Sequence, residues 1–289
     1  MHLKISTFKP DIVHPTYYRV LTPSALARAD QPVIITVFDM IHELFPERND
    51  PLCIAEAKRA CIKRADSILC ISEHTRRDLI DRYPGVADKA FVTPLASSMS
   101  VNPDQVVAAK DLDVPFFLYV GGRDGYKNFD SLLVAWSRSS LRTRGFQLRV
   151  VGTDWLPDEK IRILQLNVCD TIVHEGTVND SRLSILYRRS IALVYPSKYE
   201  GFGIPLLEAM QCGTPVVCSR TSSLPEVGGD AALYFDLADL DTLVTKMEAL
   251  AESQSLREQC IARGEAQCQK FTWSRTAKLT VEAYERVLA

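Results

Sequence analysis

Glycine is scarce in the first part of this chain of 289 residues. Gly85 stands alone among residues 1–110, and the other twelve glycines lie beyond residue 120. Because glycine lets a backbone come close to a ligand, any glycine-rich binding loop must lie in the second part. The asymmetry fits two domains, the number suggested by this length at about 100–200 residues per domain.

Three further absences narrow the function. Basic residues do not exceed acidic ones, 34 against 36, which excludes an electrostatic nucleic-acid binder. None of the eight cysteines forms a CxxC pair, so a zinc centre is not expected, and Cys70 and Cys218 interrupt apolar runs and should be buried. No apolar run approaches the ~20 residues of a membrane span, and no signal-peptide pattern opens the chain. We therefore expect a cytoplasmic protein with reduced thiols.

Short apolar, β-rich runs alternate with helical patterns along the chain. This rhythm predicts an α/β fold with parallel sheets covered by helices. We expect a first domain over residues 1–110 that includes a linker, a second over 111–270, and a last helix over 271–289 that packs back on the first. Ser72, Asn128 and Asn179 are predicted helix caps. The predicted strands are Asp11–His14, Val33–Phe38, Ser67–Ile71, Phe91–Leu95, Phe116–Val120, Gln147–Val151, Thr171–His174, Ile191–Tyr195, Pro215–Cys218 and Ala232–Phe235.

The stretch Tyr199–Gly213, YEGFGIPLLEAMQCG, joins a predicted strand to a predicted helix. The free amides and positive dipole at a helix start bind phosphate. Glu200 and Glu208 lie eight positions apart, and carboxylates accept hydrogen bonds from hydroxyl groups. The stretch predicts a ligand with sugar or ribose hydroxyls; the alternative is a plain turn with two solvated glutamates.

A second stretch, Tyr119–Asn128 with the sequence YVGGRDGYKN, also follows a predicted strand. Arg123 and Lys127 stand four positions apart among three glycines, which suits a diphosphate, although a solvated basic turn is the alternative. In open α/β sheets both loops would lie at the carboxyl ends of strands, where ligands bind.

These motifs together resemble a known family. The Glu200–Glu208 pair in GFGIPLLEAM resembles the E-x7-E signature of retaining glycosyltransferases of family 4 (glycosyl transferases group 1), supported by VGGRDGYKN and CGTPVVCSRTSSLPEVGGDAALYFD. The likeness covers about residues 10–289 and is most specific over 116–236. It implies a GT-B fold, with two Rossmann-like, doubly wound domains facing a cleft, the N-terminal one incomplete. IITVFDMIHELFP, residues 34–46, resembles the mannosyltransferase-like branch.

The resemblance also implies roles for residues of the motifs. Arg123 and Lys127 would neutralise the departing diphosphate. Glu200 would contact the donor sugar, and Glu208 would hold the ribose hydroxyls. The other donor-binding residues would be Gly122, Thr177, Val178, Gly201, Phe202, Gly203, Ile204, Pro205, Leu206 and Leu207.

On the acceptor side, Asp39 and His42 are the candidates. Many family members carry a histidine directly before the aspartate, but here the pair is Phe38-Asp39, so that histidine's role does not carry over. For His42, a structural role is an equal alternative.

The implied activity is retaining transfer of a hexose, with GDP-mannose as the first guess for the donor. No metal or cofactor is implied. The partners would be a nucleotide-sugar donor and a glycan or lipid-linked acceptor, with peripheral contact at the inner membrane face, and the oligomeric state stays open.

Two alternatives remain: an inactive, truncated nucleotide-sugar-binding protein, and a sugar-nucleotide epimerase. The inactive binding protein stays open because two-domain members of the family normally begin with a strand and a glycine-rich loop, and the first part of this chain shows no such loop. We therefore expect the acceptor domain to lack its start and to expose a sheet edge.

Overall fold

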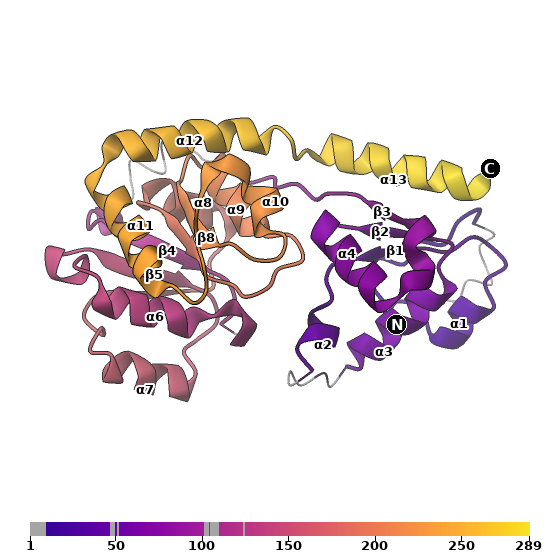
Figure 1. Ribbon diagram of the computed structural model, residues 1–289, viewed down its shortest axis with the longest axis horizontal. Helices are drawn as coiled ribbons and strands as arrows, with labels where there is room; N and C mark the ends of the chain where they lie inside the picture. The colour runs from indigo at the N-terminus through magenta and orange to yellow at the C-terminus, as the bar shows by residue number, and fades with distance from the viewer. Residues whose placement is uncertain (1–9, 47–49, 51, 101–103, 105–109, 124) are drawn as a thin grey trace. The chain divides into compact units, whose positions relative to one another are not determined.

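The computed structural model describes residues 10–289 except 47–49, 51, 101–103, 105–109 and 124 (Figure 1). The chain divides into two compact units. The first comprises the residues up to Ala96 together with Phe271–Ala289, and the second is Ser97–Lys270. In the described part, no helix is both long and apolar enough to cross a membrane.

The first unit is built on a parallel sheet of three described strands in the order β1-β2-β3. The predicted strand at Asp11–His14 is wrong, because only Val13 forms a bridge, with Val33. Pro10 and Pro15 bracket this segment, and proline has no N–H to continue a ladder. The elements of the unit's first part are α1 (Pro23–Ala27), β1 (Ile34–Val37), α2 (Ile41–Leu44), α3 (Ile54–Arg64), β2 (Ser67–Cys70), α4 (Glu73–Arg82), η2 (Pro84–Lys89) and β3 (Ala90–Val92).

The two faces of this sheet are covered by different parts of the chain. Ile35 and Ile68 belong to a core with residues of α1, α3 and α4. Ile34 and Leu69, which point to the opposite face because side chains alternate along a strand, pack with Ala283 of the last helix, α13 (Trp273–Leu288). The end of the chain therefore completes the core of the first unit.

The second unit holds a six-stranded parallel sheet in the order β6-β5-β4-β7-β8-β9. Its strands are β4 (Phe116–Val120), β5 (Gln147–Val151), β6 (Ile172–Gly176), β7 (Leu193–Tyr195), β8 (Val216–Ser219) and β9 (Ala232–Phe235). The chain runs outward from β4 to β6 and then returns to the other side of β4 with β7. This reversal is a topological switch point, where open α/β sheets bind ligands at the carboxyl ends of their strands.

Helices connect these strands, and two predicted caps are confirmed. Ser72 Oγ accepts the Thr75 N–H at the start of α4, and Asn179 caps α8. Asn128 occupies the N-cap position of α6 as predicted, but its side chain makes no cap hydrogen bond: its backbone is left-handed, and its side-chain amide donates to the carbonyl of Pro196. The connecting elements are η3 (Lys110–Leu112), η4 (Gly125–Lys127), α6 (Phe129–Arg138), η5 (Arg142–Arg144), α7 (Pro157–Gln165), α8 (Asp180–Arg189), α9 (Ile204–Gln211), α10 (Leu224–Gly228), η6 (Gly229–Ala231), α11 (Leu240–Glu252) and α12 (Gln254–Cys268).

The cysteine prediction is confirmed for both residues. Cys70 and Cys218 are fully buried, and neither forms a disulfide. Burial raises the pKa of Cys70 to about 12, so it remains a thiol at neutral pH. Both therefore act as small apolar core residues.

Candidate functional site

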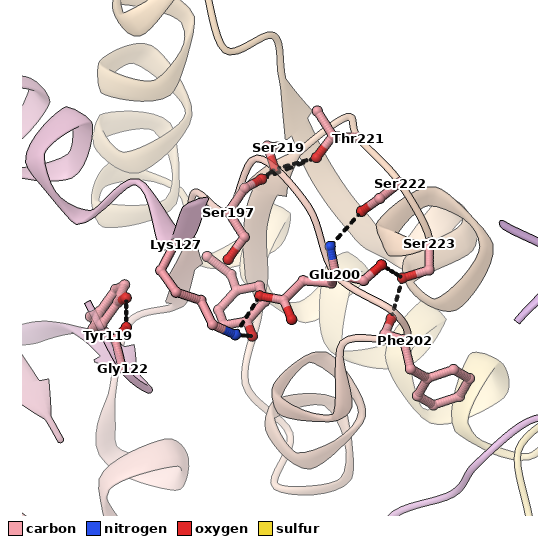
Figure 2. A network of polar contacts seen from close by, with 11 residues as sticks. Tyr119, Gly122, Lys127, Ser197, Glu200, Phe202, Ser219, Thr221, Ser222 and Ser223 are labelled. Carbon is pink, nitrogen blue, oxygen red and sulfur yellow. Dashed lines mark hydrogen bonds and ion pairs between the residues drawn. The ribbon is translucent and has the colours of Figure 1, made fainter. Parts of the chain in front are cut away.

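A buried ion pair marks the switch point of the second sheet. Lys127 ends the turn η4 that follows β4, and Glu200 lies in the loop that follows β7. Lys127 Nζ donates to Glu200 Oε1 at 2.7 Å, and the two side chains are only 16% and 9% exposed (Figure 2). The ammonium also donates to the hydroxyl of Tyr195 at 3.3 Å. The strand order thus brings together a cation and a carboxylate that lie 73 residues apart.

The helix α9 begins directly after the Glu200 loop. Gly203 precedes it with φ of 101°, a backbone conformation that favours glycine, and a Cβ at this position would also lie 2.8 Å from Leu224 Cδ2. Pro205 in the first turn suits a helix start. Leu206 and Leu207 anchor the helix in the core. The positive end of the α9 dipole therefore follows Glu200, the carboxylate of the ion pair, closely in the chain.

The backbone of the Glu200 loop is held by Ser219–Ser223, here called the serine segment, which follows β8. Ser222 Oγ accepts the N–H of Glu200 at 2.9 Å. Ser223 Oγ lies 2.9 Å from the carbonyl oxygens of both Glu200 and Phe202. Figure 2 shows these hydroxyls placed along the loop.

The same segment also binds the start of the loop. Thr221 Oγ1 donates to the carbonyl of Ser197 at 3.0 Å, and Ser219 Oγ donates to the same oxygen. Ser222 has a φ of 50°, a left-handed conformation that costs a non-glycine residue about 1–2 kcal/mol. The serine segment therefore accepts local strain while it fixes the loop that carries Glu200.

Arg123 does not join Lys127 in this structure. Its Nε donates to Glu159 Oε1 of α7 at 2.7 Å, and its Nη2 donates to the carbonyls of Thr153 and Asp154. Its guanidinium carbon lies 4.6 Å from the ring centre of Trp155, and the side chain is 2% exposed. Nη1 is buried and has no hydrogen-bond partner among the described residues. One N–H edge of the guanidinium is thus buried without a hydrogen bond among the described residues.

A glycine residue lies close to the buried Nη1 atom of Arg123, where a larger residue would not fit. A Cβ on Gly152, where β5 ends, would lie 3.0 Å from Arg123 Nη1 and 2.6 Å from the carbonyl oxygen of Gly121. Gly122 is exposed, and its carbonyl accepts the hydroxyl of Tyr119. A side chain at Gly152 would therefore displace the guanidinium of Arg123 or the backbone at Gly121.

Glu208 lies on α9 beside a buried tyrosine. Tyr187 OH donates to Glu208 Oε2 at 2.9 Å. Burial raises the pKa of Glu208, the Tyr187 hydrogen bond lowers it in part, and the charge of Asp180 raises it further. Asp180 begins α8, directly after the loop with the exposed Thr177 and the half-buried Val178. The fold therefore brings the start of α8 near enough to Glu208 for the charge of Asp180 to affect its pKa.

The two candidates for the acceptor side belong to the first unit. Asp39 lies two residues beyond β1, its Oδ1 accepts the N–H of Ile41 at 2.9 Å, and its side chain is 27% exposed. His42 lies in α2, and its Nδ1 is buried without a hydrogen-bond partner among the described residues.

The sequence analysis did not identify the residues that bind and position the predicted site residues. Glu159 lies on α7, 36 positions from Arg123, and no spacing pattern connects the two residues. Tyr187 is a fully buried residue in an amphipathic helix and looks like ordinary core. The run of hydroxyl residues at Ser219–Ser223 was a usable signal. In the described part, no group of three or more His, Cys, Asp or Glu could hold a metal ion.

Two family models match the chain. The model of "Glycosyl transferases group 1" matches residues 102–267, and that of "Glycosyltransferase Family 4" matches residues 1–96. The O-antigen chain mannosyltransferase B of Escherichia coli is 33% identical over 294 residues, which cover 96% of this chain and 75% of that protein. The serotype-specific mannosyltransferase WbdA of the same organism is 27% identical over 99% of this chain but only 38% of its own length.

Solved structures agree on the fold. A sucrose-phosphate synthase from Thermosynechococcus elongatus superposes with a TM-score of 0.80 at 20% identity, covering 98% of this chain and 75% of that one. HepE from Anabaena, in complex with UDP and glucose, superposes with a TM-score of 0.78 at 18% identity, covering 95% and 77%. The expected GT-B fold, with parallel α/β units, is confirmed.

Proposed function

The chain belongs to the glycosyl transferases group 1 family and is a glycosyltransferase, and from this we propose that it transfers mannose from GDP-mannose, with retention, to a glycan or lipid-linked acceptor. Mannose is supported by the relatives, which are an O-antigen chain mannosyltransferase and serotype-specific mannosyltransferases. A growing polysaccharide anchored at the inner membrane face is the acceptor that fits these relatives.

The observation that carries the proposal is the Lys127–Glu200 pair at the start of α9. The two charges neutralise each other at a position where a diphosphate would meet a cation and a helix dipole. A bound donor would take over the Lys127 ammonium, and the Glu200 carboxylate would then be free to accept a hydroxyl of the sugar. The pair thus offers one partner to each half of a nucleotide sugar.

The remaining residues fit the same ligand. Glu208, held by Tyr187, would accept the ribose hydroxyls, and the Nη1 edge of Arg123 would donate to the diphosphate. The backbone from Gly201 to Leu207 would enclose the sugar and the diphosphate.

The reaction follows from where charge develops. The bond between the sugar C1 and the diphosphate oxygen breaks through an oxocarbenium-like state, and negative charge grows on the leaving group. Preorganised positive charge from Lys127, Arg123 and α9 lowers this barrier. The acceptor oxygen then bonds to C1 on the face that the diphosphate leaves, and its proton passes to a phosphate oxygen.

The test is a donor panel on the purified chain. GDP-mannose, GDP-glucose, UDP-glucose and UDP-N-acetylglucosamine are each mixed with the protein and a mannose-terminated acceptor, and the products are read by mass spectrometry. We expect transfer from GDP-mannose. Lys127→Met should reduce turnover by about 10²–10³-fold, as for the loss of one charge-stabilising donor. Lys198→Met is the matched control, because Lys198 is exposed and lies two residues from Glu200.

Each other outcome selects an alternative. Calorimetric binding of a donor without transfer or hydrolysis would support an inactive binding protein. Conversion of one nucleotide sugar into another would support an epimerase. Full activity of Lys127→Met would overturn the assignment of the diphosphate position.

A further inference from the structure

Arg123 is enclosed by a group of residues that keeps it away from any ligand. It lies in the loop after β4, and only 2% of its side chain is exposed. The residues that enclose it, here called the arginine-binding cluster, are Thr153, Asp154 and Trp155 after β5 and Glu159 of α7. A ligand outside the protein therefore cannot contact the guanidinium in this conformation.

The cluster satisfies the guanidinium only in part. A guanidinium has five N–H donors. Nε donates to Glu159 Oε1 at 2.7 Å, and Nη2 lies 3.1 Å from Glu159 Oε2 and within 2.9 Å of the carbonyl oxygens of Thr153 and Asp154. Nη1 is buried and has no hydrogen-bond partner among the described residues. Buried donors without a partner are costly, so an anion that met this arginine would supply acceptors that the cluster does not.

The cluster residues have other partners besides the arginine. Glu159 Oε2 also accepts the N–H of Leu156 at 2.8 Å, at the start of α7, where the helix dipole stabilises a carboxylate. The carbonyl oxygen of Thr153 also lies 3.0 Å from His174 Nε2. The ring centre of Trp155 lies 4.9 Å from that of His174. Departure of the arginine therefore leaves these three groups with partners of their own.

The unpaired edge of Arg123 lies at the ligand-binding side of the sheet. A Cβ on Gly152, directly after β5, would lie 3.0 Å from Nη1, which places this atom where β4 and β5 end side by side. Lys127 belongs to the same loop after β4. Ligands of open α/β sheets bind at this carboxyl edge, and a change of rotamer alone can move a guanidinium out of the cluster.

We propose that Glu159 is a positioning residue that keeps Arg123 out of contact with the donor until the diphosphate of the donor binds and releases it. On release, Arg123 exchanges a carboxylate for a ligand of greater negative charge, and Nη1 gains acceptors. A ligand shifts such an equilibrium through its different affinity for the two conformations, and here only the released arginine can bind it. The diphosphate rests on the proposed function; the enclosure of Arg123 by Glu159 does not.

Nucleotide binding by the full chain tests the release. GDP and UDP are titrated by calorimetry, and the nucleotide that binds more tightly is used for the variants. Glu159→Gln retains an oxygen that can accept the N–H of Leu156 but removes the charge that binds Arg123. We expect this variant to bind the nucleotide about three- to tenfold more tightly, because the arginine is released in a larger fraction of the molecules. Arg123→Ala/Glu159→Gln should bind no more tightly than Arg123→Ala.

A neighbouring carboxylate provides the matched control. Asp158 is exposed and precedes Glu159 in the first turn of α7. Asp158→Asn removes the same charge from the same helix end and should bind the nucleotide as the wild type does. Equal tightening by Asp158→Asn and Glu159→Gln would indicate a general charge effect and overturn the proposal. Unchanged or weaker binding by Glu159→Gln, with its fold verified by circular dichroism, would overturn it as well.

The fluorescence of Trp155 reports on the arginine directly, because the guanidinium carbon lies 4.6 Å from the ring centre. The emission of Trp155 is obtained by difference from the Trp155→Phe variant. We expect the nucleotide to change this emission in the wild type but not in Arg123→Ala, and Glu159→Gln to show part of the change before nucleotide is added. No change in the wild type, or the same change in Arg123→Ala, would overturn the release.

Transfer is measured separately with GDP-mannose and a mannose-terminated acceptor. A wild-type chain that transfers mannose without a change in Trp155 emission would overturn the release of Arg123 and leave the proposed function standing. A chain that binds the nucleotide with the expected change but transfers no sugar would overturn the proposed function and leave the role of Glu159 standing. A wild-type chain that binds neither GDP nor UDP would overturn both.

Discussion

At the scale of single residues, the candidate site depends on side chains that bind one another in the second unit. Lys127, Glu200 and Glu208 stand out in the sequence through their motifs. The structure adds that Lys127 and Glu200 bind each other and that Glu208 is held by the buried Tyr187. Burial then raises the pKa of Glu208, which makes this carboxylate a feature that weakens the ligand-free fold.

Glu208→Gln should therefore separate stability from activity. Since the pKa of Glu208 is raised on folding, the folded chain binds the proton more tightly than the unfolded chain, and stability is lost as pH rises from the ordinary value of 4.5 through the raised value. At pH 7 the glutamine variant should unfold at the same or a higher temperature than the wild type. Its kcat/KM for the donor should fall about 10–100-fold through loss of a charged acceptor for hydroxyls.

Thermal unfolding at pH 4 and pH 7, together with donor kinetics, checks this. The stability difference between variant and wild type should shrink at pH 4, where Glu208 is protonated. A glutamine variant that is less stable than the wild type at pH 7 would contradict the burial argument. Glu282→Gln on α13 serves as the control for a glutamate outside the site.

At the scale of elements, the serine segment after β8 organises the loop after β7. Four hydroxyl groups of Ser219–Ser223 bind the backbone of Ser197–Phe202, and Ser222 adopts a left-handed backbone to do so. Parallel strands that lie side by side present their following loops at the same edge, which makes this contact available. The loop that carries Glu200 is thus positioned by a segment 22 residues further on.

Two substitutions of Ser222 should distinguish its hydroxyl from its backbone conformation. Ser222→Gly relieves the left-handed strain and should leave the free energy of unfolding within about 1 kcal/mol of the wild type. Ser222→Ala keeps the strain and should be the less stable of the two. Because both lose the bond to the Glu200 N–H, both should lower kcat about tenfold.

Urea unfolding and turnover of the two variants, with Ser255→Ala on the exposed face of α12 as the control, measure this. Wild-type turnover in the Ser222→Gly variant would show that the hydroxyl does not position the loop.

At the scale of the whole chain, the last helix belongs to the first unit. Tyr284 of α13 pairs its hydroxyl with His14 Nδ1 at 2.7 Å, and His14 Nε2 lies 3.0 Å from Thr36 Oγ1. Ala283 packs against β1 and β2 beside this contact. The two ends of the described chain are therefore joined by a half-buried polar contact and a small apolar core.

The His14 contact should make this unit sensitive to acid. Burial lowers the pKa of His14, so the unfolded chain takes up its proton more readily than the folded one. The stabilising contribution is complete above the ordinary value of 6.5 and is lost as pH falls below it. We expect the unfolding temperature to drop between pH 7 and pH 5, and His14→Gln to show a smaller drop. Equal pH dependence of the two proteins would argue against His14 as the source.

Sequence patterns predicted most helices and strands because these elements form through interactions between residues close together in the chain. Alternating apolar runs, caps such as Ser72, and the helix start after Gly203 each depend on residues within a few positions. The motif residues Lys127, Glu200 and Glu208 could be identified from the sequence because each lies in a short local motif. The failure at Asp11–His14 came from the prolines that bracket this segment, and the side chain of Asn128 forms no cap bond because it donates to the distant carbonyl of Pro196.

The sequence by itself determined an α/β chain whose glycine-rich loops lie in its second part and carry the charged motif residues. Only the tertiary structure decided that Lys127 neutralises Glu200, that Arg123 is bound by Glu159, and that α13 completes the first sheet. These contacts join positions tens to hundreds of residues apart. The order of the strands and the packing of the faces select such partners, and no local spacing encodes that order.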